Sequence, residues 1–174
     1  MAKATVPTIS NTSTPEEVHA QLKETGCCII KNLVPESLME QMLEELDPWW
    51  DKTPPGADEF TGYKTQRLSA LVAKSKAYGE LVMNPTMVET ANLILRDRCD
   101  HIQFGCSHGV RIAPGESPQW LHRDDTLYKD YPTTHPKNGE ELLFNMFWAI
   151  TEYTETNGAT QVVPYSHLWD GKRE

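Results

Sequence analysis

The chain has 174 residues, 39% of them hydrophobic, so it is long enough for one sizeable core and too short for two ordinary domains. Its formal charge of −9 comes from 16 basic and 25 acidic residues and argues against a nucleic-acid or anionic-membrane partner, because both attract basic surfaces. The same balance disfavours substrates that carry several phosphates. The favoured ligand is an uncharged, largely apolar small molecule.

Cysteine spacing and apolar runs bear on the cellular compartment. The four cysteines show no Cys-x-x-Cys spacing, and residues 1–4 open no apolar signal region, so we predict reduced thiols in a cytoplasmic protein. The longest mainly apolar run, residues 142–150, is far shorter than the ~20 residues that a membrane helix requires. We expect no membrane segment, and we leave a homodimer open as the oligomeric state.

The first part of the chain is predicted to be mainly helical, over residues 14–98, after a flexible, irregular stretch over residues 1–13. Thr14 can cap a helix, Pro15 fits the first helical position and Glu17 completes a capping box. This helix should reach Thr25 and stop at Gly26.

Three further elements follow in this region. The segment Cys27–Leu33 reads as a short buried strand, and apolar residues at three- and four-residue spacing predict a helix from Pro35 to Asp47-Pro48. Trp49 and Trp50 come next, with packing at a helix end favoured over a role in a substrate cavity. We predict another helix over Leu81–Arg96, with Asn84-Pro85 as a start signal, whereas residues 64–71 stay unassigned.

From residue 99 onward the chain takes on strand character. Strands are predicted within His101–Ile112, from alternating and aromatic residues, within Leu142–Ile150, which is dense in Leu, Phe, Met and Trp, and within the short, β-rich Ala159–Pro164, with turn residues between them. Helices followed by strands indicate an α+β chain built around a β-sandwich or jelly roll. We count five to six strands where a jelly roll needs about eight, so its C-terminal strands are expected to be missing.

The segment Gln119–Asp125 contains the clearest chemical signal. It follows a Pro- and Gly-containing turn and shows no helical period, so we expect an extended backbone. On a strand, His122 and Asp124 project from the same face. Two histidines and one carboxylate on one face of a metal are typical of non-haem Fe(II) oxygenases. The alternative for this bare triplet is a surface strand with solvated side chains.

Three motifs together resemble the phytanoyl-CoA dioxygenase family, above all its fungal members that modify alkaloids and meroterpenoids. They are Gln119-x-x-His122-Arg123-Asp124-Asp125, Asn157-Gly158-Ala159-Thr160 and Pro164-Tyr165-Ser166-His167-x-Trp169. The resemblance covers nearly the whole chain from about Thr14. It implies a single oxygenase domain over residues 1–174 with a double-stranded β-helix (jelly roll, cupin-like), N-terminal helices packed on the sheet, and residues 99–174 as the first part of the jelly roll.

The resemblance also implies a site. His122 and Asp124 match the family's iron ligands, Gln119 and Thr160 match positions that contact the cosubstrate 2-oxoglutarate, and Asn145 matches an inward-facing strand position near cosubstrate or substrate. A surface Gln and a turn Thr are the alternatives for Gln119 and Thr160. Weaker candidates for the substrate pocket, for which ordinary packing or solvation is favoured, are Arg67, Tyr128 and Trp148.

The third iron ligand and the arginine that pairs with 2-oxoglutarate are not evident in the sequence. His167 lies in a segment that is a structural turn in the family, and Lys172 and Arg173 follow it too soon. His101 and His108 are expected on opposite faces of a strand, and His19 and His135 as solvated. We therefore expect the missing groups beyond Glu174 or on a partner chain.

The first hypothesis is thus an Fe(II)- and 2-oxoglutarate-dependent dioxygenase, in which O₂ oxidises an apolar natural product, a terpenoid, meroterpenoid or alkaloid. Hydroxylation is the default outcome, with desaturation or rearrangement as alternatives. The second hypothesis is a catalytically inactive oxygenase-like subunit or metabolite-binding partner protein. A zinc hydrolase is a third, weaker reading, because His and Asp also bind zinc.

Overall fold

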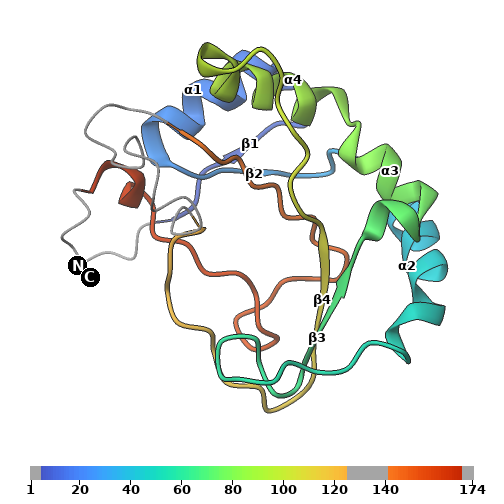
Figure 1. Cartoon of the computed structure of the whole chain (residues 1–174). Coiled ribbons are helices and arrows are strands. Elements are labelled where there is room, and N and C mark those ends of the chain that lie inside the picture. The colour runs from blue at the N-terminus through green and yellow to red at the C-terminus, as the bar shows by residue number, and fades with distance from the viewer. Residues whose placement is uncertain (1–4, 125–140, 170–174) are drawn as a thin grey trace.

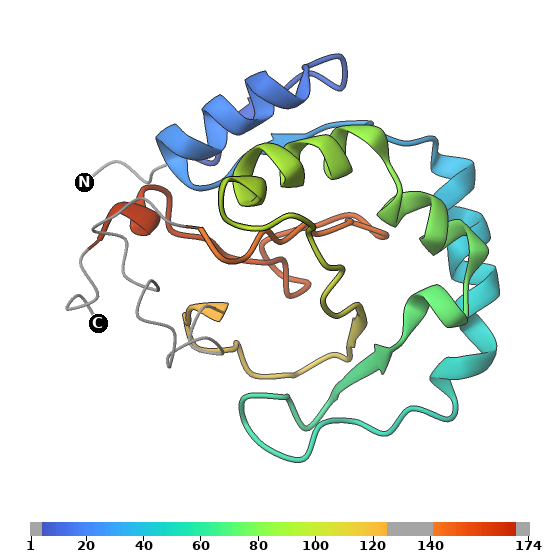
Figure 2. The ribbon, with the colours of Figure 1, turned by 45° about the horizontal axis from the view of Figure 1, so that its top comes forward.

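The computed structural model describes residues 5–124 and 141–169 and shows an α+β chain, as predicted. Its four α-helices are α1 (Pro15–Thr25), α2 (Glu36–Trp50), α3 (Lys76–Val82) and α4 (Pro85–Leu95). They follow one another along one side of the molecule, with α1 packed against α4 and α2 against α3 (Figures 1 and 2). The 141–169 segment crosses the middle of the view, reaching from beside β2 (Ile29–Ile30) toward β4 (His108–Ile112) and back (Figure 1).

Helix α1 begins and ends as the sequence predicts. The Thr14 hydroxyl accepts a hydrogen bond from the Glu17 backbone N–H at 3.3 Å, and the Glu17 carboxylate accepts one from the Thr14 N–H at 3.0 Å. At the other end Gly26 has φ 79°, a left-handed conformation that glycine adopts without steric cost. These local contacts fix both ends of the helix.

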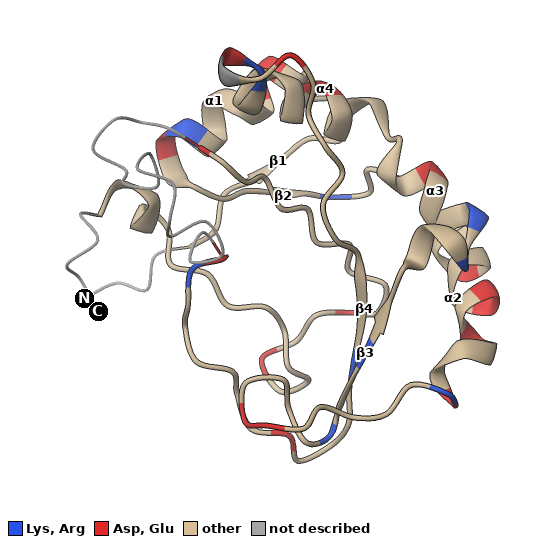
Figure 3. Cartoon of the chain, viewed as in Figure 1, with Lys and Arg blue, Asp and Glu red and all other residues tan. Residues whose placement is uncertain are grey.

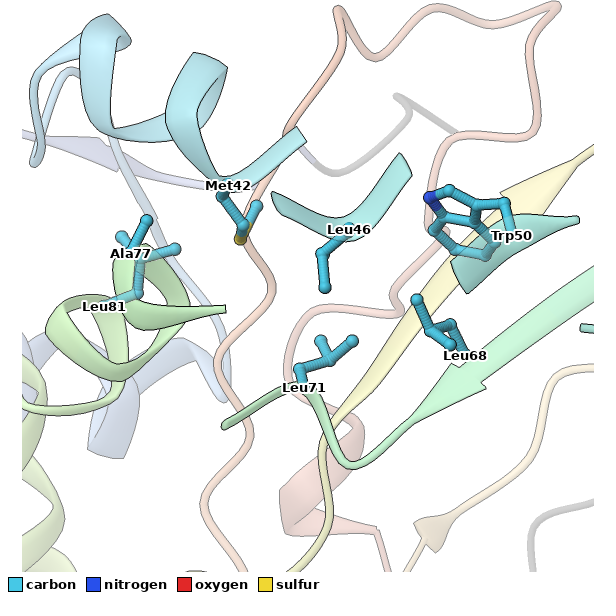
Figure 4. Packing of buried hydrophobic residues seen from close by; sticks show 7 residues of the cluster. All are labelled: Met42, Leu46, Trp50, Leu68, Leu71, Ala77 and Leu81. Atoms are coloured by element: carbon cyan, nitrogen blue, oxygen red, sulfur yellow. The ribbon is translucent and has the colours of Figure 1, made fainter. Parts of the chain in front are cut away.

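Helix α2 carries the main hydrophobic core. Met42, Leu46 and Trp50 repeat at four-residue spacing on one face and are at most 6% exposed. They pack against Leu68, Leu71, Ala77 and Leu81 (Figure 4). Burying each large apolar side chain stabilises the fold by about 1.5–3 kcal/mol. The predicted end near Asp47-Pro48 lies two residues before the observed one, because the helix continues through Pro48 to the buried Trp50.

The predicted helix over Leu81–Arg96 is two helices in the structure. Helix α3 ends at Val82, and α4 starts at Pro85 with the Asn84 side chain accepting a hydrogen bond from the Met87 backbone N–H at 3.3 Å. The Asn84-Pro85 start signal is thus confirmed. Leu81, which is fully buried, belongs to the preceding helix and anchors it in the core.

The described strands form two small sheets. Strand β1 (Thr8–Ile9) pairs in parallel with β2 (Ile29–Ile30), so residues 8–9 are ordered within the stretch that we expected to be irregular. Strand β2 lies inside the predicted Cys27–Leu33, but Ile29 is 47% exposed rather than buried. Strand β3 (Thr65–Ser69) fills part of the unassigned 64–71 stretch and pairs antiparallel with β4 (His108–Ile112).

The expected strands over Leu142–Ile150 and Ala159–Pro164 are not formed, and the described residues contain no closed barrel. The first of these segments still alternates like a strand, with Phe144, Met146, Trp148 and Ile150 partly buried and the residues between them exposed. A strand also needs a hydrogen-bonded neighbour. Within the described part of the chain, no backbone hydrogen bond joins this segment to another one.

Two surface properties bear on partners. No described helix is long and apolar enough to cross a bilayer. Lys and Arg residues of the described part of the chain are scattered along the ribbon rather than gathered into one stripe (Figure 3). The expectation that nucleic acid is not a partner stays a prediction.

Candidate functional site

The imidazole of His122 is held by a backbone carbonyl two residues earlier in the chain. Its Nδ1 lies 2.8 Å from the Trp120 carbonyl oxygen, which can only accept a hydrogen bond, so this nitrogen carries a proton. In the neutral ring Nε2 therefore holds the free lone pair. A backbone carbonyl that fixes the tautomer in this way is typical of metal-binding histidines.

The free nitrogen faces Asp124. His122 Nε2 lies 3.4 Å from Asp124 Oδ1, and the two side chains are 38% and 45% exposed. Metal–ligand bonds of about 2.1 Å place two adjacent donors about 3.0–3.4 Å apart. The expected convergence of the two side chains is present. It arises from an irregular backbone over residues 116–123, however, and not from the predicted strand.

Asn145 orients the carboxylate. Its Nδ2 donates a hydrogen bond of 2.7 Å to Asp124 Oδ2, which leaves Oδ1 toward His122. Asn145 comes from the 142–150 segment, whose alternate side chains pack against the core. The amide thus ties the candidate metal-binding carboxylate to a segment whose Trp148 and Ile150 pack against the hydrophobic core.

A third protein ligand is not grouped with this pair. Among residues 5–124 and 141–169, no cluster of three His, Cys, Asp or Glu side chains could hold a metal ion. His167 Nε2 lies 3.0 Å from the Lys23 carbonyl oxygen at the end of α1, and His101 and His108 are exposed. His135 lies outside the described residues. The donors present therefore fit two of the three protein positions around a divalent cation.

Gln119 contacts a loop rather than this pair. Its Nε2 donates to the Phe60 carbonyl oxygen at 3.0 Å. The Phe60 ring in turn meets the His122 imidazole edge to face, with ring centroids 4.8 Å apart and an interplanar angle of 71°. Thr160 is exposed, and no hydrogen bond joins it to His122 or Asp124 among the described residues.

The weaker pocket candidates have other contacts. Arg67 Nε donates to the Thr61 carbonyl oxygen at 3.2 Å, and Trp148 is half-buried against the α2 core. Tyr128 lies outside the described residues. Sequence reasoning missed Phe60, which precedes Gln119 by 59 residues, because no local pattern links the two positions.

Glu116 joins the turn before this site to strand β3. Its carboxylate accepts hydrogen bonds from the Lys64 backbone N–H at 2.6 Å and from the Thr65 hydroxyl at 2.9 Å. The Lys64 N–H is the main cause that holds the pKa of Glu116 below its ordinary value. This carboxylate thus links the turn before the candidate site to the start of β3.

Comparison with known proteins supports an oxygenase family. The model of the family described as "Phytanoyl-CoA dioxygenase (PhyH)" matches residues 22–174. Dioxygenase olcK of Penicillium canescens is 31% identical over 163 residues, which cover 89% of this chain and 54% of the relative. Dioxygenase cdmA of Talaromyces verruculosus is 32% identical over 172 residues, 94% of this chain and 58% of the relative.

Multifunctional dioxygenase prhA of Penicillium brasilianum is 30% identical over 163 residues, 91% of this chain and 54% of the relative. The chain thus spans a little over half the length of these curated relatives. Because the family model covers the chain from residue 22 to residue 174, the chain belongs to the phytanoyl-CoA dioxygenase family.

Proposed function

We propose that the chain acts as an Fe(II)- and 2-oxoglutarate-dependent dioxygenase on an apolar small molecule. The observation that carries this proposal is the pair of donors His122 Nε2 and Asp124 Oδ1, 3.4 Å apart. Each donor is oriented by a second group, the Trp120 carbonyl for the imidazole and the Asn145 amide for the carboxylate. Membership of the family and its dioxygenase relatives support the same reading.

The chemistry divides between the cofactor and the chain. When bound, Fe(II) with 2-oxoglutarate and O₂ would supply the oxidising power, with succinate and CO₂ as the coproducts of the keto acid. His122 and Asp124 would hold the metal on one side and leave the opposite side open. Asn145 keeps the charged oxygen of Asp124 in place, so little reorganisation is needed when a cation binds. The proposal includes the fold: a jelly roll would hold these residues around the metal.

The substrate class follows from charge and from the surroundings of His122. A net charge of −9 disfavours a polyphosphorylated substrate. The aromatic ring of Phe60 lies directly against His122, so an apolar side chain borders the candidate metal site. A terpenoid, meroterpenoid or alkaloid fits this environment.

A catalytically inactive oxygenase-like subunit is the second candidate. The observation that favours it is the lack of a third metal ligand beside His122 and Asp124 in the described part of the chain. Such a protein would keep the fold and bind a metabolite or an active partner. It would not form succinate.

Metal titration and succinate formation separate these readings. We would titrate the chain with Co²⁺, an optical substitute for Fe²⁺, and assay succinate with Fe²⁺, 2-oxoglutarate and ascorbate. His122→Ala and Asp124→Ala should each weaken Co²⁺ binding at least ~10-fold, whereas His101→Ala, at an exposed histidine away from the pair, should not. Binding without succinate favours the inactive subunit, and unchanged binding in both variants refutes the site.

A further inference from the structure

The loop between α2 and β3 places Phe60 on the candidate metal ligand. Phe60 lies far from His122 in sequence, yet the two rings meet edge to face at 4.8 Å. Phe60 is 41% exposed, so burial in the core does not account for its position. The contact is therefore a specific one between this loop and the site.

The loop is itself built to hold Phe60. The Asp58 carboxylate accepts hydrogen bonds from the Thr61 backbone N–H at 2.7 Å and from its hydroxyl at 2.8 Å, which closes a tight turn around Phe60. Arg67 on β3 donates to the Thr61 carbonyl oxygen, and Gln119 donates to the carbonyl oxygen of Phe60 itself. These hydrogen bonds fix both the Phe60 carbonyl and the backbone of the next residue, Thr61.

These contacts restrict the His122 ring in a second way. The Trp120 carbonyl selects which nitrogen carries the proton, but by itself it leaves the ring some freedom to tilt. A phenyl ring at an interplanar angle of 71° blocks that tilt on one side. Together the two contacts keep Nε2 directed at Asp124, as binding one cation with both residues requires.

We infer that Phe60 is a positioning residue for His122 and that Gln119 acts by holding Phe60 in place. The inference rests on the proposed function, because it concerns the geometry of the same metal site. It gives Gln119 a task through Phe60, beside the cosubstrate contact that the family resemblance implies. It also makes the 58–61 turn part of the site.

Co²⁺ titration of the full chain, followed by visible absorption, tests this assignment. Phe60→Ala should weaken Co²⁺ binding about 3–10-fold, below the largest effects known for residues that orient metal ligands. Phe60→Tyr keeps the ring and should restore binding to within about twofold of the parent. Tyr63→Ala is the matched control, since Tyr63 lies on the same loop and is 59% exposed.

A double substitution separates the two roles of Gln119. If it acts only through Phe60, Gln119→Ala should weaken Co²⁺ binding in the parent and have no further effect in the Phe60→Ala background. If Gln119→Ala weakens Co²⁺ binding as much in the Phe60→Ala background as in the parent, Gln119 does not act through Phe60, and its part of the inference is overturned.

His122→Ala distinguishes failure of this inference from failure of the proposed function. Loss of Co²⁺ binding in His122→Ala, with parent-like binding in Phe60→Ala and Phe60→Leu, overturns the role of Phe60 and leaves the metal site standing. Parent-like binding in His122→Ala overturns both. Circular dichroism checks that each variant is folded, and Phe60→Leu replaces Phe60→Ala in the comparison if the alanine variant is not.

Discussion

His122 and His167 are both oriented by backbone carbonyls, with opposite results. His122 uses Nδ1 for this contact and presents Nε2 to Asp124. His167 places Nε2 against the Lys23 carbonyl oxygen at the C-terminal end of α1, and its Nδ1 is buried with no hydrogen-bond partner among the described residues. A histidine in this position satisfies a helix-end carbonyl. This contact supports a structural role for His167.

Gly26 tests the packing of His167 on the helix end. A Cβ at Gly26 would lie 2.5 Å from His167 Nδ1, and the backbone there has φ 79°. We predict that Gly26→Ala destabilises the protein by more than the roughly 1–2 kcal/mol that a left-handed non-glycine residue costs, because the imidazole must also move. The free energy of unfolding in urea measures this effect.

Gly79 provides the control for that substitution. It lies inside α3, and a Cβ there would have no heavy atom within 4 Å. Gly79→Ala should stabilise the protein by about 0.5–1 kcal/mol, because alanine loses less backbone entropy in a helix. Equal destabilisation by both substitutions would contradict the specific role given to Gly26.

At the scale of single residues, the sequence predicts the pair but not its surroundings. The two-residue spacing brings His122 and Asp124 together even without a strand, because short separation limits how far they can diverge. The Phe60 contact could not be predicted, since it depends on how the loop before β3 folds back. Asn145 was expected near the site, and its side-chain amide donates a hydrogen bond to Asp124.

At the scale of elements, Glu45 joins α2 to the start of α3. Its carboxylate accepts hydrogen bonds from the Ser75 hydroxyl at 2.6 Å and the Ala77 backbone N–H at 3.1 Å, and Gln41 donates to its other oxygen at 2.8 Å. The Ser75 hydrogen bond is the largest cause that lowers the pKa of Glu45 from 4.5 to about 2. A negative charge is also favourable at a helix N-terminus.

We predict that Glu45→Gln reduces stability at neutral pH and flattens its dependence on acid. Because the folded-state pKa is lowered, the carboxylate stabilises the fold above pH 4.5, and this contribution is lost as the pH falls toward about 2. Urea midpoints measured across that range should therefore fall more steeply for the parent than for the variant. Parallel curves would show that the Glu45 contacts do not contribute.

The helices were more predictable than the strands for a physical reason. The capping box of Thr14 and the Asn84-Pro85 start signal involve only residues close in sequence, so they form whatever the helix packs against. A strand depends on a neighbour that is remote in sequence, as β3 depends on β4. The 142–150 segment has the right alternation of side chains, but no backbone hydrogen bond joins it to another described segment.

At the scale of the whole molecule, large apolar side chains remain at the surface. Those more than 60% exposed include Trp120, Leu121, Phe147 and Leu168, and the first two directly precede the candidate metal ligand His122. Burying each such side chain in a contact with another protein surface is worth about 1.5–3 kcal/mol. The net charge of −9 opposes self-association, but salt screens that repulsion.

We therefore predict that the 174-residue polypeptide self-associates, and does so more strongly as salt rises. Added salt weakens the repulsion between acidic chains, and sulfate also strengthens burial of apolar surface, so both effects act in the same direction. Phe147→Ser should reduce association, since Phe147 is 63% exposed on the face of the 142–150 segment that points away from the core. Size exclusion with light scattering, at low and high ammonium sulfate, gives the mass of the parent and the variant. A monomer at every salt concentration would mean that these apolar side chains do not drive association.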